Sequence, residues 1–550
     1  MNRLRFKIRI IFYFIIGGLF CLNTTAQLPF IDSNLPIFII NTNGQNIPDD
    51  PKITAHLGII DNGVERNSLT DPFNDYDGQI AIELRGSTSQ ELFDKKSFGF
   101  ETQLEDGSNN NVSILGFPEE NDWVLQGPFS DKTYLRNALA YRFARQTGQY
   151  ASRNRFCEVI LNGAYKGVYL LLEKIKQDKN RVDIADLLPT DVTGDELTGG
   201  YILKIDKLTG AVATSWISNY PPLVGSWQTT LFQVHYPKAE NLKQAQLGYI
   251  KNYISDFEDM LMSSSFDDPD MGYEAWIDVQ SFIDFIIVNE LTKNVDAYRL
   301  STFFYKEKDS NGGKIKMGPA WDFNIAMGNG NYCDGWNPEG LSMDFNSRCS
   351  QDFWIVHFWW KKLISEEKFG HLLSQRWKNY RASIFSQESI YEAIDSMSQL
   401  LAEAERRDHQ LYPIIGEFVW PNEFIGNSYN EEIDYLKGWF AQRLTFLDSA
   451  FERFDTSSTN SNVNSIPIVF PNPFTEELTV ERETISRNVI LLTLYDSQGK
   501  LIKGNRLVAQ GAGTHKWKVP TDGLASGIYF YKIEQSGELL DSGKLIKNSN

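Results

Sequence analysis

The chain changes its hydrophobic period once, near residue 240, and this change limits the folds open to it. From 27 to about 240 the apolar residues mostly alternate, as in "QIAIELRG", which predicts strands joined by turns. Beyond 240 they recur every three or four residues, as at Ile250, Ile254 and Phe257, which predicts helices. We therefore predict an α+β fold with a strand-rich N-terminal part and a helical C-terminal part.

Turn and capping residues refine this prediction. Asn162-Gly163 separates two apolar runs and favours a β-hairpin, and a second pair of runs flanks the turn residues 309–313. A helix is expected after Ser130-Asp131, ending near Gly148, and Asp278 is a plausible N-cap for another. Further helices are predicted over 351–383, 386–409 and 429–453.

Both ends of the chain differ from this main part. Residues 1–26 combine early basic residues with a 13-residue apolar run, which is typical of a signal peptide and short of the roughly 20 residues a spanning helix needs. No later segment is expected to span a membrane. We assign 27–454 to the main domain, 455–467 ("DTSSTNSNVNSIP") to a linker, and 468–550 to a small all-β sandwich.

Charge and cysteine content limit the partners. A formal charge of -18 argues against binding nucleic acid, which is done with clustered Lys and Arg. Cys333 and Cys349 could form a disulfide in an oxidising compartment, leaving Cys157 as a buried thiol. No histidine lies at ligand spacing from another His or a Cys, so no zinc site is expected.

The first candidate site is "ELRGSTSQELFDKK". A turn at Arg85, Gly86 and Ser87 could offer backbone N–H groups to phosphates, with Lys95 or Lys96 as a point charge. The alternative is a surface turn with a solvated lysine pair.

The second candidate is Glu173, which ends an apolar strand in "GVYLLLEKIK". Such an acid can hold a lysine across a cleft, as the Lys–Glu pair of kinases does. The alternative is an ordinary surface ion pair.

The third candidate is the pair Asp296 and Asp322, at the two ends of the second hairpin. Because a hairpin brings its ends together, one carboxylate could bind a divalent ion while the other accepts a hydroxyl proton. Burying Asp322 between Trp321 and Phe323 is costly unless a cation compensates. The alternative is two turn-capping aspartates.

In combination, "RGSTSQ…KKSFGFE", "NGAYKGVYLLLEKIK" and "NVDAYR…GPAWDFNIAMGN" resemble the CotH (spore-coat protein H) kinase family of atypical secreted protein kinases. The resemblance implies a kinase-like domain that binds ATP with Mg²⁺ or Mn²⁺ and phosphorylates Ser or Thr of an extracytoplasmic protein. It implies that Lys96 (or Lys95) contacts phosphate and pairs with Glu173. Asp296 would then be catalytic or metal-binding, and Asp322 would bind the metal. Asn324 stands where many members carry a second acid and would offer a neutral oxygen.

The C-terminal motifs "VFPNPFTEELTV", "LYDSQGKLI" and "LASGIYFYKI" resemble a type A sorting domain of the type IX secretion system, found in Bacteroidota. This resemblance implies export across the outer membrane by that machinery and a secreted or cell-surface location. Because ATP is scarce there, a glycan- or protein-binding role on a kinase-like fold stays open. A metal-dependent hydrolase using Asp296 and Asp322 would leave the lysine and Glu173 unexplained.

Overall fold

The computed structural model describes residues 30–208, 212–455, 467–484, 487–511, 513–535 and 538–548. The predicted signal peptide (1–26) and most of the predicted linker (456–466) lie outside the described residues. Within the described ranges, no helix is long and apolar enough to cross a membrane.

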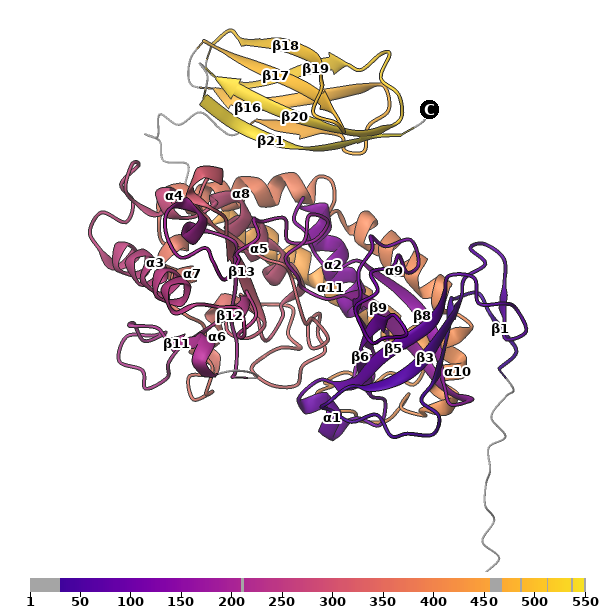
Figure 1. Ribbon diagram of the computed structural model, residues 1–550. Coiled ribbons are helices and arrows are strands. Elements are labelled where there is room, and N and C mark those ends of the chain that lie inside the picture. The colour runs from indigo at the N-terminus through magenta and orange to yellow at the C-terminus, as the bar shows by residue number, and fades with distance from the viewer. Residues whose placement is uncertain are drawn as a thin grey trace, which may run out of the picture.

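The N-terminal part closes into a β-barrel in the order β2-β3-β5-β6-β7-β9-β8, coloured indigo to violet in Figure 1. All neighbours pair antiparallel except β2 and β8, which are parallel. Its strands are β2 (Ile37–Asn41), β3 (Ile53–Ile60), β5 (Tyr76–Arg85), β6 (Ser97–Gln103), β7 (Asp122–Gln126), β8 (Asn154–Leu161) and β9 (Ala164–Glu173). A two-stranded sheet of β1 (Asp32–Ser33) and β4 (Asn67–Ser68) and the short helix α1 (Thr88–Leu92) complete this part.

The hairpin predicted at Asn162-Gly163 joins β8 to β9, as expected. Both turn residues have positive φ, 51° and 77°, which an Asn-Gly pair adopts at low cost. The alternation of the strand sequences places Phe100, Leu125 and Leu171 in the barrel's own apolar core.

A second, five-stranded sheet has the order β11-β12-β10-β13-β14. Its strands are β10 (Tyr201–Ile205), β11 (Ser215–Ile217), β12 (Leu231–Tyr236), β13 (Thr302–Lys306) and β14 (Ile315–Met317). The second predicted hairpin is the antiparallel pair β13–β14, so that prediction is also confirmed.

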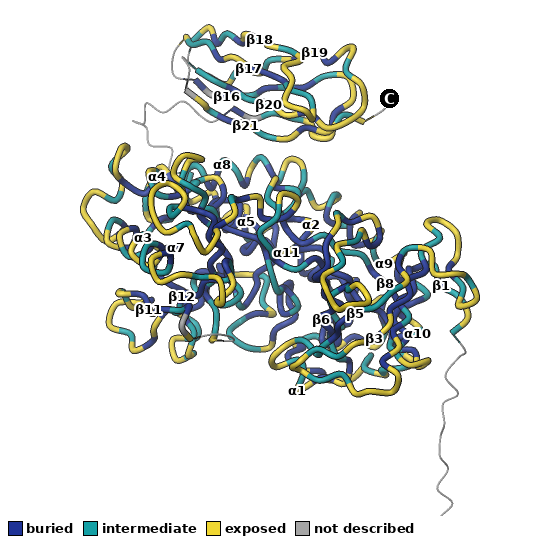
Figure 2. The backbone as a smooth tube through the Cα atoms, viewed as in Figure 1, coloured by how far each residue is buried: buried dark blue, intermediate teal, exposed yellow. Residues whose placement is uncertain are grey.

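Most helices follow from residue 244; besides the short α1, α2 (Arg136–Gln146) comes earlier, where the sequence predicted it. The later helices are α3 (Gln244–Met262), α4 (Tyr273–Trp276), α5 (Val279–Thr292), α6 (Phe345–Arg348), α7 (Trp359–Ile364), α8 (Glu367–Arg381), α9 (Gln387–Leu401), α10 (Ala404–Leu411) and α11 (Tyr429–Glu452). Asp278 caps α5 as predicted, because its carboxylate accepts a hydrogen bond from the Ser281 N–H at 2.9 Å. Figure 2 shows α5 buried along most of its length.

The helical prediction over 351–383 is confirmed from residue 359 and is wrong for 351–358. Residues 351–358 are not helical, because side chains bind their backbone N–H groups: Asp352 accepts from Trp354 N at 2.9 Å and Asn346 from Val356 N at 2.7 Å. The remainder is divided into α7 and α8, since the Glu366 carboxylate caps the start of α8. The predicted helix 386–409 is likewise divided, into α9 and α10.

The C-terminal strands form two antiparallel sheets, β15-β16-β19 and β18-β17-β20-β21, drawn in yellow in Figure 1. They are β15 (Ile468–Phe470), β16 (Glu477–Thr484), β17 (Asn488–Asp496), β18 (Leu501–Ala509), β19 (Gly513–Pro520), β20 (Gly527–Gln535) and β21 (Glu538–Lys547). Leu478, Leu492 and Ile533 belong to a separate apolar core, so this part is all-β as predicted.

The cysteines are arranged as the sequence suggested. Cys333 and Cys349 form a disulfide, with Cα atoms 5.7 Å apart. Cys157 is a free, buried thiol in β8.

Candidate functional site

Three aspartates gather at one edge of the five-stranded sheet. Ile205 at the end of β10 pairs with Thr302 at the start of β13, and Phe304 pairs with Met317 of β14. Because these strands are antiparallel, the end of β10, the start of β13 and the end of β14 lie together. Asp206 follows β10, Asp296 lies in the turn before β13, and Asp322 lies in the segment after β14.

Asn294 joins the two predicted acids. Its side-chain oxygen accepts from the Asp296 N–H at 3.2 Å, and its side-chain Nδ2 donates to the Asp322 carbonyl at 3.2 Å. Asp322 itself has φ of +64°, a left-handed conformation that costs a non-glycine residue energy and concentrates at functional sites. The structure thus brings Asp296 and Asp322 together through a buried amide.

The carboxylates interact electrostatically. Burial raises the pKa of Asp296, but the guanidinium of Arg299, 2.8 Å away, opposes the shift. Burial together with the charges of Asp296 and Asp206 raises the pKa of Asp322 to about 7. Within the described chain, the Asp322 carboxylate has no hydrogen-bond or ion-pair partner.

Two cations face this acid without binding it. Arg85, the last residue of β5, lies over the Trp321 ring with Cζ 5.3 Å from the centroid, and it lowers the pKa of Asp322. Lys207 also lowers the pKa of Asp322, and its ammonium donates a hydrogen bond to the Ser87 hydroxyl at 3.2 Å. The barrel therefore contributes Arg85, and the sheet contributes Lys207 and the carboxylates, to one site.

The predicted turn at Gly86 and Ser87 is part of this site. Gly86 has φ of +116°, and a Cβ there would lie 2.1 Å from the Ser89 hydroxyl, so only glycine fits. Asn324 is half-buried two residues after Asp322, and its carbonyl accepts from Asn329 Nδ2 at 2.8 Å.

Lys95 does not serve this site. Its side chain is fully buried and its Nζ lies 2.5 Å from the Asp408 carboxylate of α10. The rings of Tyr134, Tyr169 and Tyr412 surround the ammonium at 5.3 to 5.5 Å. The prediction that Lys95 could contact phosphate is corrected: Lys95 lies in the bend between α1 and β6, where the buried Asp408 carboxylate and three tyrosine rings hold its ammonium inside the protein.

Lys96 is committed to the local backbone. Its Nζ donates to the carbonyls of Gln90 at 2.6 Å and Phe93 at 2.5 Å. It therefore holds the segment after the Gly86 turn in place, and in this conformation Arg85 and Lys207 are cations that act on Asp322.

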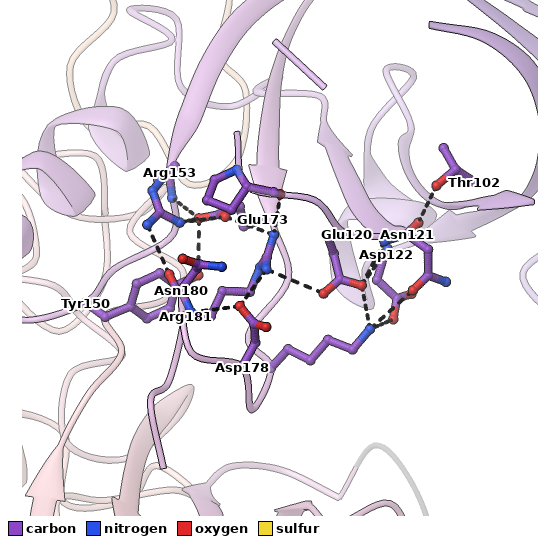
Figure 3. Close-up of polar contacts among 12 residues, drawn as sticks. Thr102, Glu120, Asn121, Asp122, Tyr150, Arg153, Glu173, Asp178, Asn180 and Arg181 are labelled. Carbon is purple, nitrogen blue, oxygen red and sulfur yellow. Dashed lines mark hydrogen bonds and ion pairs between the residues drawn. The ribbon is translucent and has the colours of Figure 1, made fainter. Parts of the chain in front are cut away.

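Glu173 is buried in an arginine network instead of pairing with Lys96 (Figure 3). Its carboxylate lies 2.8 Å from Arg153 Nη1 and 3.2 Å from Arg181 Nη2. Arg181 also forms ion pairs with Asp178 at 3.0 Å and with Glu120 at 3.6 Å. The predicted Lys96–Glu173 pair is wrong, because β9 ends on the side of the barrel where these arginines lie.

Sequence reasoning missed Asp206, Lys207 and Asn294. "YILKIDK" did contain a signal, since an acid and a base directly follow an apolar strand. Their place beside Asp322 depends on the pairing of β10 with β13, which spans about a hundred residues of sequence.

The oxygen-bearing side chains of the site are of the kind that binds a hard cation, but they do not form a complete set of metal ligands. The described residues contain no group of three or more His, Cys, Asp or Glu arranged to hold a metal ion. Carboxylate oxygens are nevertheless the ligands that Mg²⁺ prefers, and it often binds through one or two of them together with phosphate oxygens. An unpartnered, partly desolvated carboxylate at Asp322 fits that mode of binding.

Comparison with solved structures finds proteins of weak similarity to this chain. They include dimeric latent PorU from Porphyromonas gingivalis (19% identity, 17% of this chain and 10% of that chain, TM-score 0.14) and the C-terminal domain of wzt (15% identity, 16% and 75%, TM-score 0.13). A third is the DNA glycosylase AlkC from Pseudomonas fluorescens (12% identity, 38% and 63%, TM-score 0.13). The chain thus covers a tenth of PorU, and none of these similarities supports an argument about fold or function. No curated protein matches the chain.

Family comparison is informative. The family described as secretion system C-terminal sorting domain matches residues 468–548, which indicates export by type IX secretion to the cell surface or the medium. The family described as CotH kinase protein matches residues 82–447, a range that contains every residue of the site described above. The chain therefore belongs to the CotH kinase protein family.

Proposed function

We propose that this exported protein binds ATP with a divalent metal and transfers phosphate to Ser or Thr of an extracytoplasmic protein. The observation that carries the proposal is the unpartnered Asp322 carboxylate, grouped with Asp206 and Asp296 and faced by Arg85 and Lys207. Phosphoryl transfer needs charge neutralisation and positioning above all, and this arrangement supplies groups for both.

The carboxylates of Asp322 and Asp206 would hold Mg²⁺ or Mn²⁺, with the neutral oxygen of Asn324 as a further ligand. When bound, the metal would neutralise charge on the phosphates. Protonated Asp322 would be a poor ligand, so its pKa of about 7 makes binding sensitive to neutral pH.

Arg85, Lys207 and the turn at Gly86 and Ser87 would contact the phosphate groups. Arg85 is held over Trp321 and offers a fixed guanidinium, and the turn offers backbone N–H groups. In this proposal Lys96 positions the turn, and Lys95 and Glu173 stabilise the barrel.

Asp296 would orient the acceptor hydroxyl and take its proton as the hydroxyl oxygen bonds to the γ-phosphorus and ADP leaves. Arg299 at 2.8 Å favours the ionised carboxylate, the form that can accept the proton. Asp296 can therefore act as an acceptor while Asp322 serves the metal.

The test is nucleotide binding and transfer by the full chain. We expect ATP with Mg²⁺ or Mn²⁺ to raise the melting temperature, by an amount equivalent to about 2.7 kcal/mol at 100 times the dissociation constant. Radiolabelled phosphate should appear on a Ser-rich peptide, and Asp322→Ala should abolish both effects. Asp395→Ala, at an exposed ion pair with Lys437, is the matched control. No thermal shift and no labelling in the unsubstituted protein would refute the proposal.

A binding role is the second candidate, because two large aromatic side chains are exposed near the site. Trp227 is 61% exposed and Phe353 58% exposed, and their rings lie 5.7 Å apart. Phe353 directly follows Asp352, which pairs with Arg299. Binding of a glycan or protein ligand with an affinity that neither a chelator nor nucleotide changes would favour this role.

A further inference from the structure

Arg299 forms a buried ion pair with Asp296, an acid of the site. Its side chain is 2% exposed, and Nη2 contacts the Asp296 carboxylate at 2.8 Å. Arg299 Nε donates to the Val295 carbonyl at 2.9 Å, which fixes the guanidinium against the turn that carries Asp296. The direction of the Asp296 carboxylate therefore depends on where the Arg299 guanidinium is held.

The other side of Arg299 is held by a distant segment. Its Nη1 donates to the Trp354 carbonyl at 3.0 Å and lies 3.4 Å from the Asp352 carboxylate. Its guanidinium carbon also lies 4.0 Å from the centroid of the Phe345 ring. All three contacts come from residues 345–354, which contain the second cysteine of the disulfide.

The disulfide fixes this segment. Cys333–Cys349 closes the loop that contains Phe345, and the Cys349 carbonyl accepts from the Asp352 N–H at 3.0 Å. A small cavity of about 10 Å³ lies beside the loop, lined in part by Val295, Cys333 and Phe345. The disulfide therefore ties the segment that holds Arg299 covalently to residue 333.

We propose that Arg299 is a positioning residue for Asp296 and that the Cys333–Cys349 disulfide fixes Arg299, so that the site is fully ordered only in the oxidised protein. The catalytic consequence rests on the proposed function, whereas the structural consequence does not. An exported protein would then acquire its ordered site in the oxidising compartment where the bond persists.

Hydrogen exchange tests the positioning without reference to activity. Three variants of the full chain are compared: Arg299→Met, the double variant Cys333→Ser/Cys349→Ser, and the control Arg376→Met, which breaks the α8–α5 ion pair with Asp284. We expect backbone exchange over 294–300 to accelerate at least tenfold in the first two and to stay within twofold in the control. Unchanged exchange over 294–300 in the double variant would overturn the proposal.

A reductant provides a second route if the cysteine variant fails to fold. Dithiothreitol passes two electrons and two protons to the disulfide, giving two thiols and its own cyclic disulfide. Folded protein treated in this way should show the same acceleration over 294–300, and the Cys157→Ala variant should respond identically. Insensitivity of 294–300 to verified reduction would equally overturn the proposal.

Kinetics separates this proposal from the proposed function. If the unsubstituted protein transfers phosphate, opening the disulfide and Arg299→Met should each lower kcat at least tenfold while the dissociation constant for ATP changes less than threefold. Normal kcat with an open disulfide would overturn the positioning role. If the unsubstituted protein transfers no phosphate, the proposed function fails, and hydrogen exchange alone decides whether the disulfide orders Asp296.

Discussion

The guanidinium of Arg85 lies over the indole ring of Trp321, with Cζ 5.3 Å from the ring centroid. Arg85 ends a strand of the barrel, and Trp321 immediately precedes Asp322. This contact therefore joins the two parts of the main domain where a cation and an unpartnered acid face each other. Burial lowers the pKa of Arg85, but an arginine stays charged at any physiological pH.

We expect Arg85→Ala to weaken binding of ATP roughly 10- to 100-fold, because a hydrogen bond to a charged group contributes about 1.5–3 kcal/mol. Calorimetric titration of the full chain with a non-hydrolysable ATP analogue and Mg²⁺ would measure the change. The control is Arg155→Ala, which removes a half-exposed barrel arginine 3.4 Å from Asp61. Equal affinities in the two variants would exclude Arg85 from the phosphate site.

Local features of the fold could be predicted from the sequence because their causes are local. Asp278 caps α5 through a residue three positions away, and Asn162-Gly163 forms its turn through its own φ angles. Apolar patterning likewise predicted β5, β8, β9 and α11. The helix expected at 351–358 failed for the same kind of reason, since Asp352 and Asn346 bind the backbone there.

The site was only partly predictable because its geometry depends on pairing between distant segments. The convergence of Asp296 and Asp322 followed from one hairpin, whereas Asp206 joins them only through the register of β10 against β13. Lys95 and Glu173 looked functional as isolated residues. Their partners, Asp408 and Arg181, lie in segments that no local pattern connects to them.

Glu173→Gln should lower the free energy of unfolding by about 1.5–3 kcal/mol, the contribution of a hydrogen bond to a charged group, because Arg153 and Arg181 lose this carboxylate while Arg181 keeps Asp178 and Glu120. Urea denaturation would measure this loss. The affinity of the folded protein for ATP should stay within about twofold, since Glu173 lies in the arginine network rather than beside Asp322. A stable variant that no longer binds ATP would reinstate the kinase-like role expected for this glutamate.

Lys95→Met should cost about 3 kcal/mol of stability, because the Asp408 carboxylate would remain buried without its ammonium. Asp408→Asn in the same chain should recover part of this loss, since an amide needs no counter-charge. A double-mutant cycle followed by thermal denaturation would give the coupling between the two residues. Simple additivity of the two single losses would mean that the ion pair contributes no interaction energy.

Asp322→Asn should stabilise the metal-free protein at pH 8 but not at pH 4. The folded-state pKa of Asp322 is about 7, against about 4 for an unfolded aspartate, so the fold favours the protonated form. The stability from protonation is complete below pH 4 and is lost as the pH rises to 7. Because Asp322 is half-buried, we expect a gain on the order of 1–2 kcal/mol at pH 8, measured by denaturation in a chelator. A gain that is the same at both pH values would contradict this assignment.

Metal affinity should rise with pH, whereas the stability of the metal-free protein falls. Protons compete with the metal for Asp322, so with a pKa of about 7 the affinity for Mn²⁺ should fall about fivefold between pH 7 and pH 6 and change little above pH 8. Calorimetric titration of the full chain with Mn²⁺ at pH 6, 7 and 8.5 would measure this profile, and Asp322→Asn should abolish binding at all three. Binding that is equally tight at pH 6 and 8.5 would require ligands other than this carboxylate, and the cation would then have to lie elsewhere in the fold.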